Sequence, residues 1–402
     1  MKKKVLKNGM KIVYKKVPSK VVTLQVTILI GANVEEKKQY GISHFVEHMI
    51  FEGTKTKPDA RVISNEIERL GGDFNATTTN ENISYYITVP SKHFRTALTV
   101  LDDIYKNSTF SKEKVEKERR VIIDEVKMIN DDPKDYRWIL FDKTIFEKHP
   151  MKNPVYGDLE VLKKITRDEL FEFYKKYHIP NNTLITVVGD VPDPISKIEK
   201  HFKDLVRQKI PKQKEYREPS PRRIAKREKR RGTSSYLTMG WKTCSAKHKD
   251  MYALEVIYGI LSRGQSGRLF DEVRGKRGLC YSIGAYHNYC IDIGYFAVHC
   301  ITDKKNFKKV TELIIKEMKK LQEITEEDIK DAKTYLEGDL IVGSESTQYV
   351  AEKIAYWEQL TKVEDYDNYI HNIKSVTVAD IKRVAKKYFT AKYAITTLEQ
   401  QD

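Results

Sequence analysis

The sequence lacks any stretch of apolar residues long enough to cross a membrane. Its longest apolar run, Val21 to Ile30, is far shorter than the roughly 20 residues that a transmembrane helix requires. The basic start, Met1 to Lys4, leads into an alternating strand pattern and not into the apolar segment of a signal peptide. The sequence therefore predicts no membrane association and a cytoplasmic location, although a leader that has been removed would leave the same sequence.

Cysteine is scarce, and its spacing excludes the usual thiolate sites. The chain has four cysteines, Cys244, Cys280, Cys290 and Cys300. None of them forms a Cys-x-x-Cys pair, which argues against a zinc–thiolate centre and against a redox motif. We expect reduced residues in the core or on strands, with no role in metal binding.

Recognisable nucleic-acid motifs are also missing, although the formal net charge is +16. The densest basic run lies between Val206 and Arg231 and has few interleaved aromatic residues. A nucleic-acid-binding domain normally combines such charge with a recognisable fold motif. We expect a solvated, lysine-rich surface and no nucleic-acid partner.

The length of 402 residues is sufficient for two domains. The segment 206–221 is basic, contains three prolines and shows neither helical nor strand periodicity, which is typical of an interdomain linker. The predicted domains are 1–205 and 222–402.

The two halves of the sequence resemble each other at a constant offset. The segments 165–186 and 376–397 both run from a helix through a short break into an apolar strand. Such repetition indicates duplication of one structural unit. The predicted fold class is α+β, with two homologous domains, each a mostly antiparallel β-sheet packed with helices.

The segment 41–53 is predicted to be a short amphipathic helix. Its apolar residues recur with the spacing of one helix face. They are Ile42, Phe45, Val46 and Met49. Gly53 follows as a signal for the end of the helix.

The other side of this helix carries the pattern His-x-x-Glu-His. Residues four apart stand above one another on a helix, so His44 and His48 can converge on one ion. Glu47 lies between them, close enough to hold a water molecule bound by that ion. The pattern is the inverzincin signature, but a solvated helix face can carry the same residues. A catalytic zinc site also needs a third protein ligand.

The acid-rich helix beginning near Ser111 offers candidates for this ligand. Its buried stripe consists of Val115, Ile122, Val126 and Ile129. Asp124 points away from that stripe, whereas Glu118 and Glu125 stand together at one edge of it. The helical spacing leaves both of these glutamates open as the third ligand.

The motif and these two glutamates resemble the pitrilysin/insulysin superfamily of zinc peptidases. The similarity is greatest to its half-length branch, which includes bacterial processing peptidases and the mitochondrial processing peptidase β subunit. Two further segments match in the same order. The segment 71–77 looks like the family's substrate-pairing edge strand, and 270–281 looks like the segment whose arginine and tyrosine complete the site.

The resemblance implies a zinc endopeptidase with one Zn²⁺ per chain. It implies His44, His48 and Glu125 as metal ligands. It also implies Glu47 as the general base and Glu118 as a residue that orients a ligand or the water, with an ordinary surface carboxylate as the alternative for Glu118.

Substrate contacts are implied in both halves. Phe74, Asn75 and Ala76 would hold the substrate backbone, unless they form an ordinary hairpin strand. Arg274 would anchor the substrate, and Tyr281 would donate a hydrogen bond to the developing oxyanion. A tyrosine packed in the core is the alternative for Tyr281, because it alternates with apolar neighbours.

Full-length members of the superfamily enclose a chamber with four such domains, whereas this sequence predicts two. The resemblance therefore implies a homodimer that hydrolyses peptides or unfolded segments inside a closed chamber. Pairing with a distinct inactive chain is the other possible arrangement. A non-catalytic structural or core-type subunit is the alternative function, because the family includes core subunits of a respiratory complex.

Overall fold

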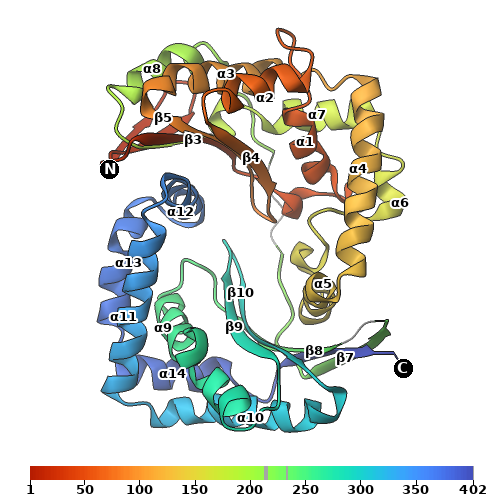
Figure 1. Cartoon of the computed structure of the whole chain (residues 1–402), viewed down its shortest axis with the longest axis vertical. Helices are drawn as coiled ribbons and strands as arrows, with labels where there is room; N and C mark the ends of the chain where they lie inside the picture. Colours follow the sequence, from red (N-terminus) through yellow and green to blue (C-terminus); the bar gives the residue numbers. More distant parts are fainter. Residues whose placement is uncertain (212–215, 232–233, 402) are drawn as a thin grey trace. The chain divides into compact units, whose positions relative to one another are not determined.

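The structure is a computed structural model that describes residues 1–211, 216–231 and 234–401, and it forms two compact units (Figure 1). Unit 1 consists of Met1–Met128, Asn153–Glu215 and Gly343–Tyr356. Unit 2 consists of Ile129–Lys152, Tyr216–Val342 and Trp357–Asp402. Each unit thus includes a segment from the other half of the sequence. The predicted bounds 1–205 and 222–402 did not anticipate these two segments, and residues 212–215 of the predicted linker lie outside the described residues.

Unit 1 is built on a six-stranded sheet with the order β1-β2-β6-β3-β5-β4. The strands are β1 (Lys2–Val5), β2 (Lys11–Lys15), β3 (Val21–Ile28), β4 (Asp73–Thr78), β5 (Ile83–Pro90) and β6 (Thr183–Val188). Neighbouring strands are antiparallel except β2 and β6, which are parallel. This agrees with the predicted mostly antiparallel sheet.

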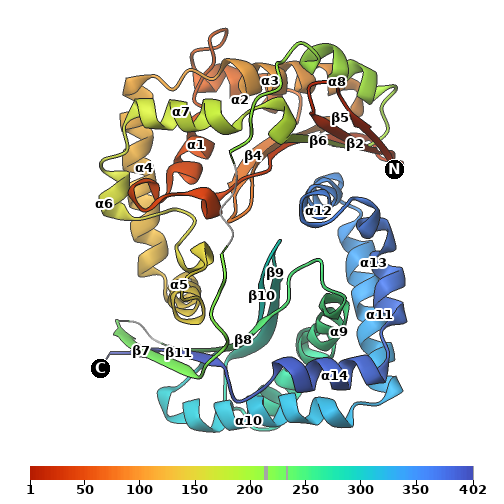
Figure 2. The same cartoon turned by 180° about the vertical axis from the view of Figure 1, so that it is seen from behind.

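Most helices of unit 1 lie on one side of this sheet (Figures 1 and 2). They are α1 (Ile42–Ile50), α2 (Ala60–Glu68), α3 (Phe94–Asn107), α4 (Lys112–Asp131), α6 (Leu159–Leu162), α7 (Arg167–Tyr177) and α8 (Pro194–Phe202). The alternation of β3 explains this arrangement, because successive side chains of a strand point to opposite faces. Leu24 and Val26 join the apolar core formed with the helices, whereas Thr23 and Gln25 are buried on the opposite face.

The first part of helix α12 (Thr347–Leu360) belongs to unit 1 and covers that opposite, polar face of the sheet. The hydroxyl of Thr23 lies 2.8 Å from that of Thr347. It lies at the same distance, 2.8 Å, from the hydroxyl of Thr88 on β5. A segment from the second half of the chain therefore completes the sheet packing of the first.

Unit 2 is built on a five-stranded sheet with the order β7-β11-β8-β10-β9. The strands are β7 (Ile224–Arg230), β8 (Ser235–Thr243), β9 (Ser282–Tyr289), β10 (Gly294–Thr302) and β11 (Ala394–Gln400). All neighbours are antiparallel except β7 and β11. The two sheets therefore share one strand arrangement. In each, the last strand along the chain pairs in parallel with an early strand, β6 with β2 and β11 with β7.

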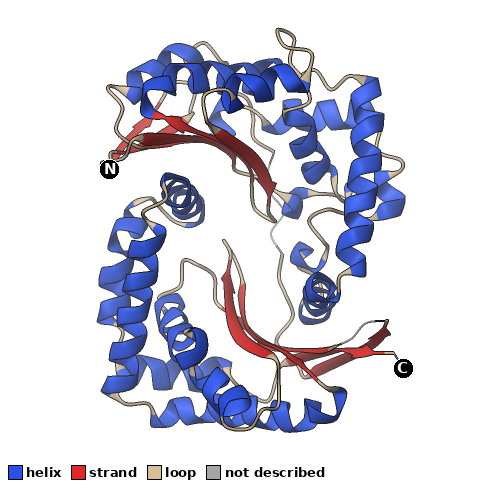
Figure 3. Ribbon diagram, in the orientation of Figure 1, coloured by secondary structure: helices blue, strands red, loops and turns tan. Residues whose placement is uncertain are grey.

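Both faces of the sheet of unit 2 are covered by helices (Figure 3). The helices are α5 (Pro133–Ile145), α9 (Asp250–Ser262), α10 (Phe307–Lys320), α11 (Glu326–Gly343), α13 (Glu364–Ser375) and α14 (Val378–Tyr388). Phe296 and Val298 on β10 join the main core of this unit, whereas Tyr295 and Ala297 join a smaller cluster with Phe141 of α5. Helix α5 thus covers the second face of the sheet in unit 2, as the first part of α12 does in unit 1.

The predicted duplication is visible in the paired segments α7–β6 and α14–β11. Each helix begins with a capping box, formed by Thr166 with Glu169 and by Thr377 with Asp380. Such a box satisfies free backbone N–H groups at a helix start. Two homologous α+β domains, as predicted, are therefore confirmed at the level of the fold.

Candidate metal centre

Helix α1 is fixed at its start by a buried carboxylate from outside the helix. Gly41 precedes the helix with a φ of 98° and offers no side-chain cap. Glu35 supplies the cap instead, because its two carboxylate oxygens accept the N–H groups of Gly41 at 2.8 Å and of Ser43 at 2.9 Å. Burial raises the pKa of Glu35 to about 7, although these two N–H groups oppose the shift.

A close approach of two glycines also fixes this helix start. A Cβ atom on Gly41 would lie 2.7 Å from the carbonyl oxygen of Tyr156, and one on Gly157 would lie 2.4 Å from Cα of Gly41. Both glycines have positive φ angles, 98° and 87°, which L-amino acids with side chains rarely adopt. Both positions therefore require glycine, which lets the two backbone segments approach this closely.

His44, His48 and Glu125 converge in unit 1. One ligand atom of each residue lies within 4.8 Å of the others. Nε2 of His48 is 3.3 Å from Glu125 Oε2, and Nε2 of His44 is 3.8 Å from Glu125 Oε1. The two imidazole rings meet at 4.7 Å between centroids with an angle of 78°. Two imidazoles and one carboxylate form a donor set that suits a catalytic zinc ion.

Glu125 reaches this point because α4 packs through its apolar stripe. Val115, Ile122 and Val126 are buried, whereas the Asp124 side chain is 75% exposed and lies 2.9 Å from Lys127. The predicted orientation of Asp124 away from the core is therefore confirmed.

Glu118 lies against the other ring nitrogen of His48. Its Oε2 is 3.3 Å from His48 Nδ1, and its side chain is only 10% exposed. The hydrogen bond from His48 lowers the pKa of Glu118, and the same kind of contact lowers the pKa of Glu125. Glu118 is thus in a position to orient the His48 ring while Nε2 faces Glu125.

The two histidines have opposite protonation preferences. Burial lowers the pKa of His44 to about 4, so this imidazole is neutral at pH 7 and has a lone pair available for a metal. Burial also acts to lower the pKa of His48, but its hydrogen bonds to Glu118 and Glu125 outweigh it and raise the pKa to about 9. A metal bound here would therefore displace a proton from His48.

Glu47 lies beside the three converging residues. Its Oε2 is 4.0 Å from His44 Nε2 and accepts a hydrogen bond of 2.8 Å from the hydroxyl of Thr78. Burial raises the pKa of Glu47, and the Thr78 hydrogen bond opposes this shift. A carboxylate with a raised pKa next to a metal site is suited to accept and return a proton.

Strand β4 forms one edge of the sheet, with β5 as its single partner in that sheet. Phe74 and Ala76 pack against the core, and the ring of Phe74 lies 4.9 Å from that of Phe51. Asn75 is exposed, and its side chain accepts the N–H of Ala76. The edge strands β1 and β7 carry several lysines or arginines, which discourage further strand pairing. Strand β4 has none, so its edge is not protected in this way.

Comparisons with known proteins identify the family of this chain. The family model described as "Insulinase (Peptidase family M16)" matches residues 11–159, and the one described as "Peptidase M16 inactive domain" matches residues 164–336. The uncharacterized zinc protease YmxG of Bacillus subtilis is 30% identical over 99% of this chain and 98% of its own length. The chain belongs to the M16 peptidase family. An uncharacterized zinc protease of Rickettsia felis is likewise 30% identical, over 96% of this chain and 94% of its own.

Solved structures share the fold of this M16 chain. A protease from Helicobacter pylori superposes with a TM-score of 0.93 at 23% identity, covering 99% of both chains. A Pseudomonas fluorescens structure titled as a peptidase M16 inactive domain gives a TM-score of 0.90 at 18% identity, covering 100% of this chain and 98% of that one. The converging residues lie in the segment matched by the first family model, and Arg274 and Tyr281 lie in the segment matched by the second.

Arg274 and Tyr281 are neighbours within unit 2. The Arg274 guanidinium lies 4.9 Å from the centre of the Phe270 ring and 5.6 Å from that of Tyr281. Tyr281 is 75% exposed, and its backbone N–H is bonded to the carbonyl of Ile301 just before β9 begins. The alternative of a tyrosine packed in the core is therefore wrong, and the phenol is free to contact a ligand.

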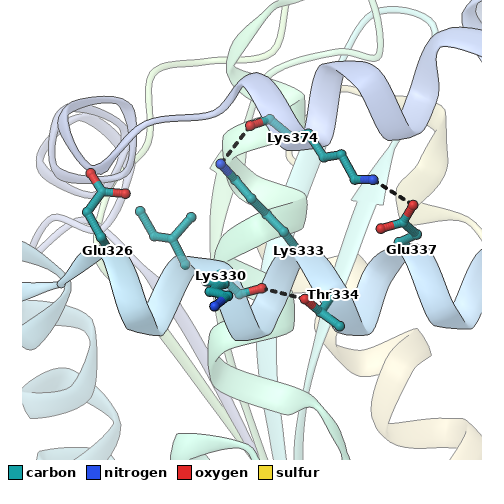
Figure 4. A pocket seen from close by; sticks show the side chains of 7 residues that line it. Glu326, Lys330, Lys333, Thr334, Glu337 and Lys374 are labelled. Atoms are coloured by element: carbon teal, nitrogen blue, oxygen red, sulfur yellow. Dashed lines mark hydrogen bonds and ion pairs between the residues drawn. The ribbon is translucent and has the colours of Figure 1, made fainter.

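A pocket in unit 2, between α11 and α13, has a structural explanation (Figure 4). Lys333 donates to the backbone carbonyls of Lys374 and Val376 at the end of α13, and Lys374 pairs with Glu337 at 2.6 Å. Cations at a helix C-terminus stabilise it through its free carbonyl groups. These polar groups serve helix packing, so the pocket is not a second candidate site.

Two residues that support the centre, Thr78 and Glu35, were not identified from the sequence. Thr78 could have been found by extending the strand alternation of Phe74 and Ala76 by one more step. Glu35 gave no comparable signal, because its role depends on a turn that brings its side chain back to the start of α1.

A membrane-spanning helix is absent from the described part of the chain, since no helix there has both the length and the apolar character required.

Proposed function

We propose that this M16 chain is a zinc-dependent endopeptidase that hydrolyses peptides or unfolded protein segments. The observation that carries the proposal is the convergence of His44, His48 and Glu125, with Glu47 beside them. The names of the relatives, which call them zinc proteases, support the choice of metal. We propose one Zn²⁺ per chain on these three residues.

The chain's own groups would carry out most of the proton chemistry. A zinc ion at this centre would supply Lewis-acid chemistry, polarising the scissile carbonyl and lowering the pKa of a water molecule. Glu47 accepts a proton from the attacking water as the new C–O bond forms. It then passes this proton to the nitrogen of the leaving amine as the C–N bond breaks. Glu118 keeps the His48 ring in place through Nδ1.

Substrate would bind as an additional strand along β4. Backbone hydrogen bonds at a free sheet edge recognise an extended peptide with little dependence on its side chains. Phe74, Asn75 and Ala76 provide this edge. In this proposal Arg274 anchors the substrate backbone, and Tyr281 donates a hydrogen bond to the oxyanion.

The active assembly that we propose is a homodimer enclosing a chamber, because one chain has two of the four domains found in full-length members of the superfamily. Sedimentation or light scattering at micromolar concentration tests this point. The cytoplasmic location expected from the sequence is likewise a prediction, which cell fractionation tests.

A non-catalytic structural subunit is the second candidate. The description of the second family model as an inactive domain favours it. Mass spectrometry of a mixed peptide library, incubated with zinc-loaded protein, separates the two functions. New peptide termini that disappear on chelation support the endopeptidase, whereas an unchanged library with zinc bound supports the structural subunit.

A further inference from the structure

The end of the edge strand β4 is tied to the proposed general base by one side chain. Thr78 is the last residue of β4 and lies opposite Ile83 of β5. Its side chain follows the alternation of Phe74 and Ala76, which places it on the side of the strand that packs against α1. Its hydroxyl donates to Glu47 Oε2 at 2.8 Å.

We propose that Thr78 is a positioning residue that couples the occupancy of strand β4 to the placement of the Glu47 carboxylate. The inference rests on the proposed function, in which Glu47 is the base and β4 receives the substrate. It goes beyond that function because the strand that binds the substrate also positions the carboxylate of the base, through Thr78.

The physical basis is the freedom of a glutamate side chain. Glu47 has three rotatable side-chain bonds, and its Oε2 is the oxygen that lies 4.0 Å from His44 Nε2. A hydrogen bond to Oε2 restrains the rotation of the carboxylate and leaves its other lone pairs free to accept a proton from a water molecule. Small displacements of a catalytic group reduce reaction rates strongly, because the reacting atoms must meet in a narrow range of geometry.

A peptide paired with β4 would order the strand up to the residue that holds the base. The Thr78 hydroxyl uses its single proton in the hydrogen bond to Glu47. Because Thr78 belongs to β4, the backbone of that strand sets the position of this donor. A substrate long enough to pair along β4 should therefore gain in kcat and not only in binding. This follows the general rule that remote binding energy can be used to align reacting groups.

The substrate class that follows is an extended peptide that spans β4 as well as the scissile bond. Short peptides that contact the metal centre alone should be cleaved with a lower kcat. A nested series of peptides with one scissile sequence and increasing length tests this in the wild-type protein loaded with zinc.

Thr78→Val is the decisive variant, since it keeps the β-branched shape and removes the donor. We expect its kcat on the longest peptide to fall on the order of tenfold, and its kcat to stop rising with peptide length. KM should still decrease with length, because strand pairing is intact. Thr78→Ser retains a hydroxyl and should restore most of the kcat.

Thr99→Val is the matched control. Thr99 is exposed on α3, away from β4, and its hydroxyl donates to the Arg95 carbonyl at 3.0 Å and not to Glu47. This variant should behave as the wild type. A readout without turnover accompanies it: binding of the longest peptide to metal-free protein, measured by fluorescence anisotropy, should be equal in all variants, as should zinc content and melting temperature.

The outcomes separate this inference from the proposed function. If wild-type protein with zinc bound cleaves no peptide, the proposed function fails and the coupling with it. If the wild type is active but Thr78→Val matches Thr99→Val in kcat, the coupling alone is wrong. Loss of zinc or of peptide binding in Thr78→Val, without a specific effect on kcat, also overturns it. Thr78→Ala provides the same comparison if the valine variant does not fold.

Discussion

Oε2 of Glu125 lies 3.3 Å from Nε2 of His48, whereas Asp124, the preceding residue, points into solvent beside Lys127. The two acids differ by one position in the sequence and by about 100° around the helix, because each residue of an α-helix turns by that angle. This difference allows a direct test of the proposed metal ligand.

Glu125→Gln should weaken zinc binding and abolish peptide hydrolysis. The amide keeps the size of the side chain but loses the negative charge that a zinc ligand provides. Asp124→Asn makes the same chemical change on an exposed site and should alter neither property. Zinc content after dialysis, measured by atomic emission, checks both variants. Metal loss in Asp124→Asn, with retention in Glu125→Gln, would exclude Glu125 as the ligand.

Glu47→Gln should separate metal binding from chemistry. The glutamine cannot accept a proton, yet its Oε1 can still accept the hydrogen bond from Thr78. We expect about one zinc per chain and a fall in kcat on the order of 10²–10⁴. Kinetics with a cleavable peptide, together with zinc content, check this expectation. Turnover close to wild type with zinc bound would remove Glu47 from the mechanism.

Glu35→Ala should destabilise the helix that carries the two histidines. The substitution leaves the buried N–H groups of Gly41 and Ser43 without their acceptor, and the loss of a cap costs about 0.5–2 kcal/mol. Urea unfolding at pH 7 measures this cost. Glu36→Ala is the control, because that side chain is 73% exposed. Equal unfolding free energies for the two variants would show that the cap contributes no stability.

The sequence was sufficient to predict helix α1 and the meeting of His44 with His48, because both depend on local helical spacing. It could not choose between Glu118 and Glu125, since both stand at one edge of the same helix. The structure distinguishes them by the nitrogen that each contacts. Glu125 lies at Nε2 of both histidines, whereas Glu118 lies at Nδ1 of His48.

The sequence could not predict, for a different reason, that α5 belongs to unit 2 and the first part of α12 to unit 1. An amphipathic pattern shows that a helix buries one face, but it does not name the sheet that the face meets. Thr23 illustrates this limit. A polar residue on a strand usually predicts a solvent-facing side, yet Thr23 is fully buried beneath Thr347.

His178 should make unit 1 less stable in mild acid. Burial lowers its pKa to about 3, and within the described residues neither ring nitrogen has a hydrogen-bond partner. Below pH about 6.5 the unfolded chain binds a proton that the folded protein does not. The free energy of unfolding should therefore fall by about 1.4 kcal/mol per pH unit from this residue alone, between pH 6.5 and 3.

His178→Phe tests this pH dependence. The ring of His178 lies 4.4 Å from that of Tyr174, so phenylalanine keeps an aromatic ring in the cluster without a titrating group. Urea unfolding between pH 5 and 7 should show a smaller loss of stability in this variant than in the wild type. His371→Phe, at an exposed position of α13, should leave the slope unchanged. Identical slopes in all three proteins would contradict the assignment.

Tyr281→Phe tests whether the second half of the sequence contributes to the proposed chemistry. The substitution removes only a hydroxyl from a side chain that is 75% exposed, so melting temperature and zinc content should stay at wild-type values. A donor used as charge develops in the transition state affects kcat more than binding. Loss of such a donor typically costs on the order of 10²–10³ in kcat, so we expect a fall of at least about tenfold.

Arg274→Lys is the companion variant, because it keeps the positive charge and loses the planar group that lies over the Tyr281 ring. If Arg274 anchors the substrate backbone, this variant should raise KM more than it lowers kcat, in contrast to Tyr281→Phe. Steady-state kinetics on one peptide separate the two patterns. An unchanged kcat in Tyr281→Phe, with an unchanged KM in Arg274→Lys, would confine the chemistry to His44, Glu47, His48 and Glu125, and would leave the second half a structural role.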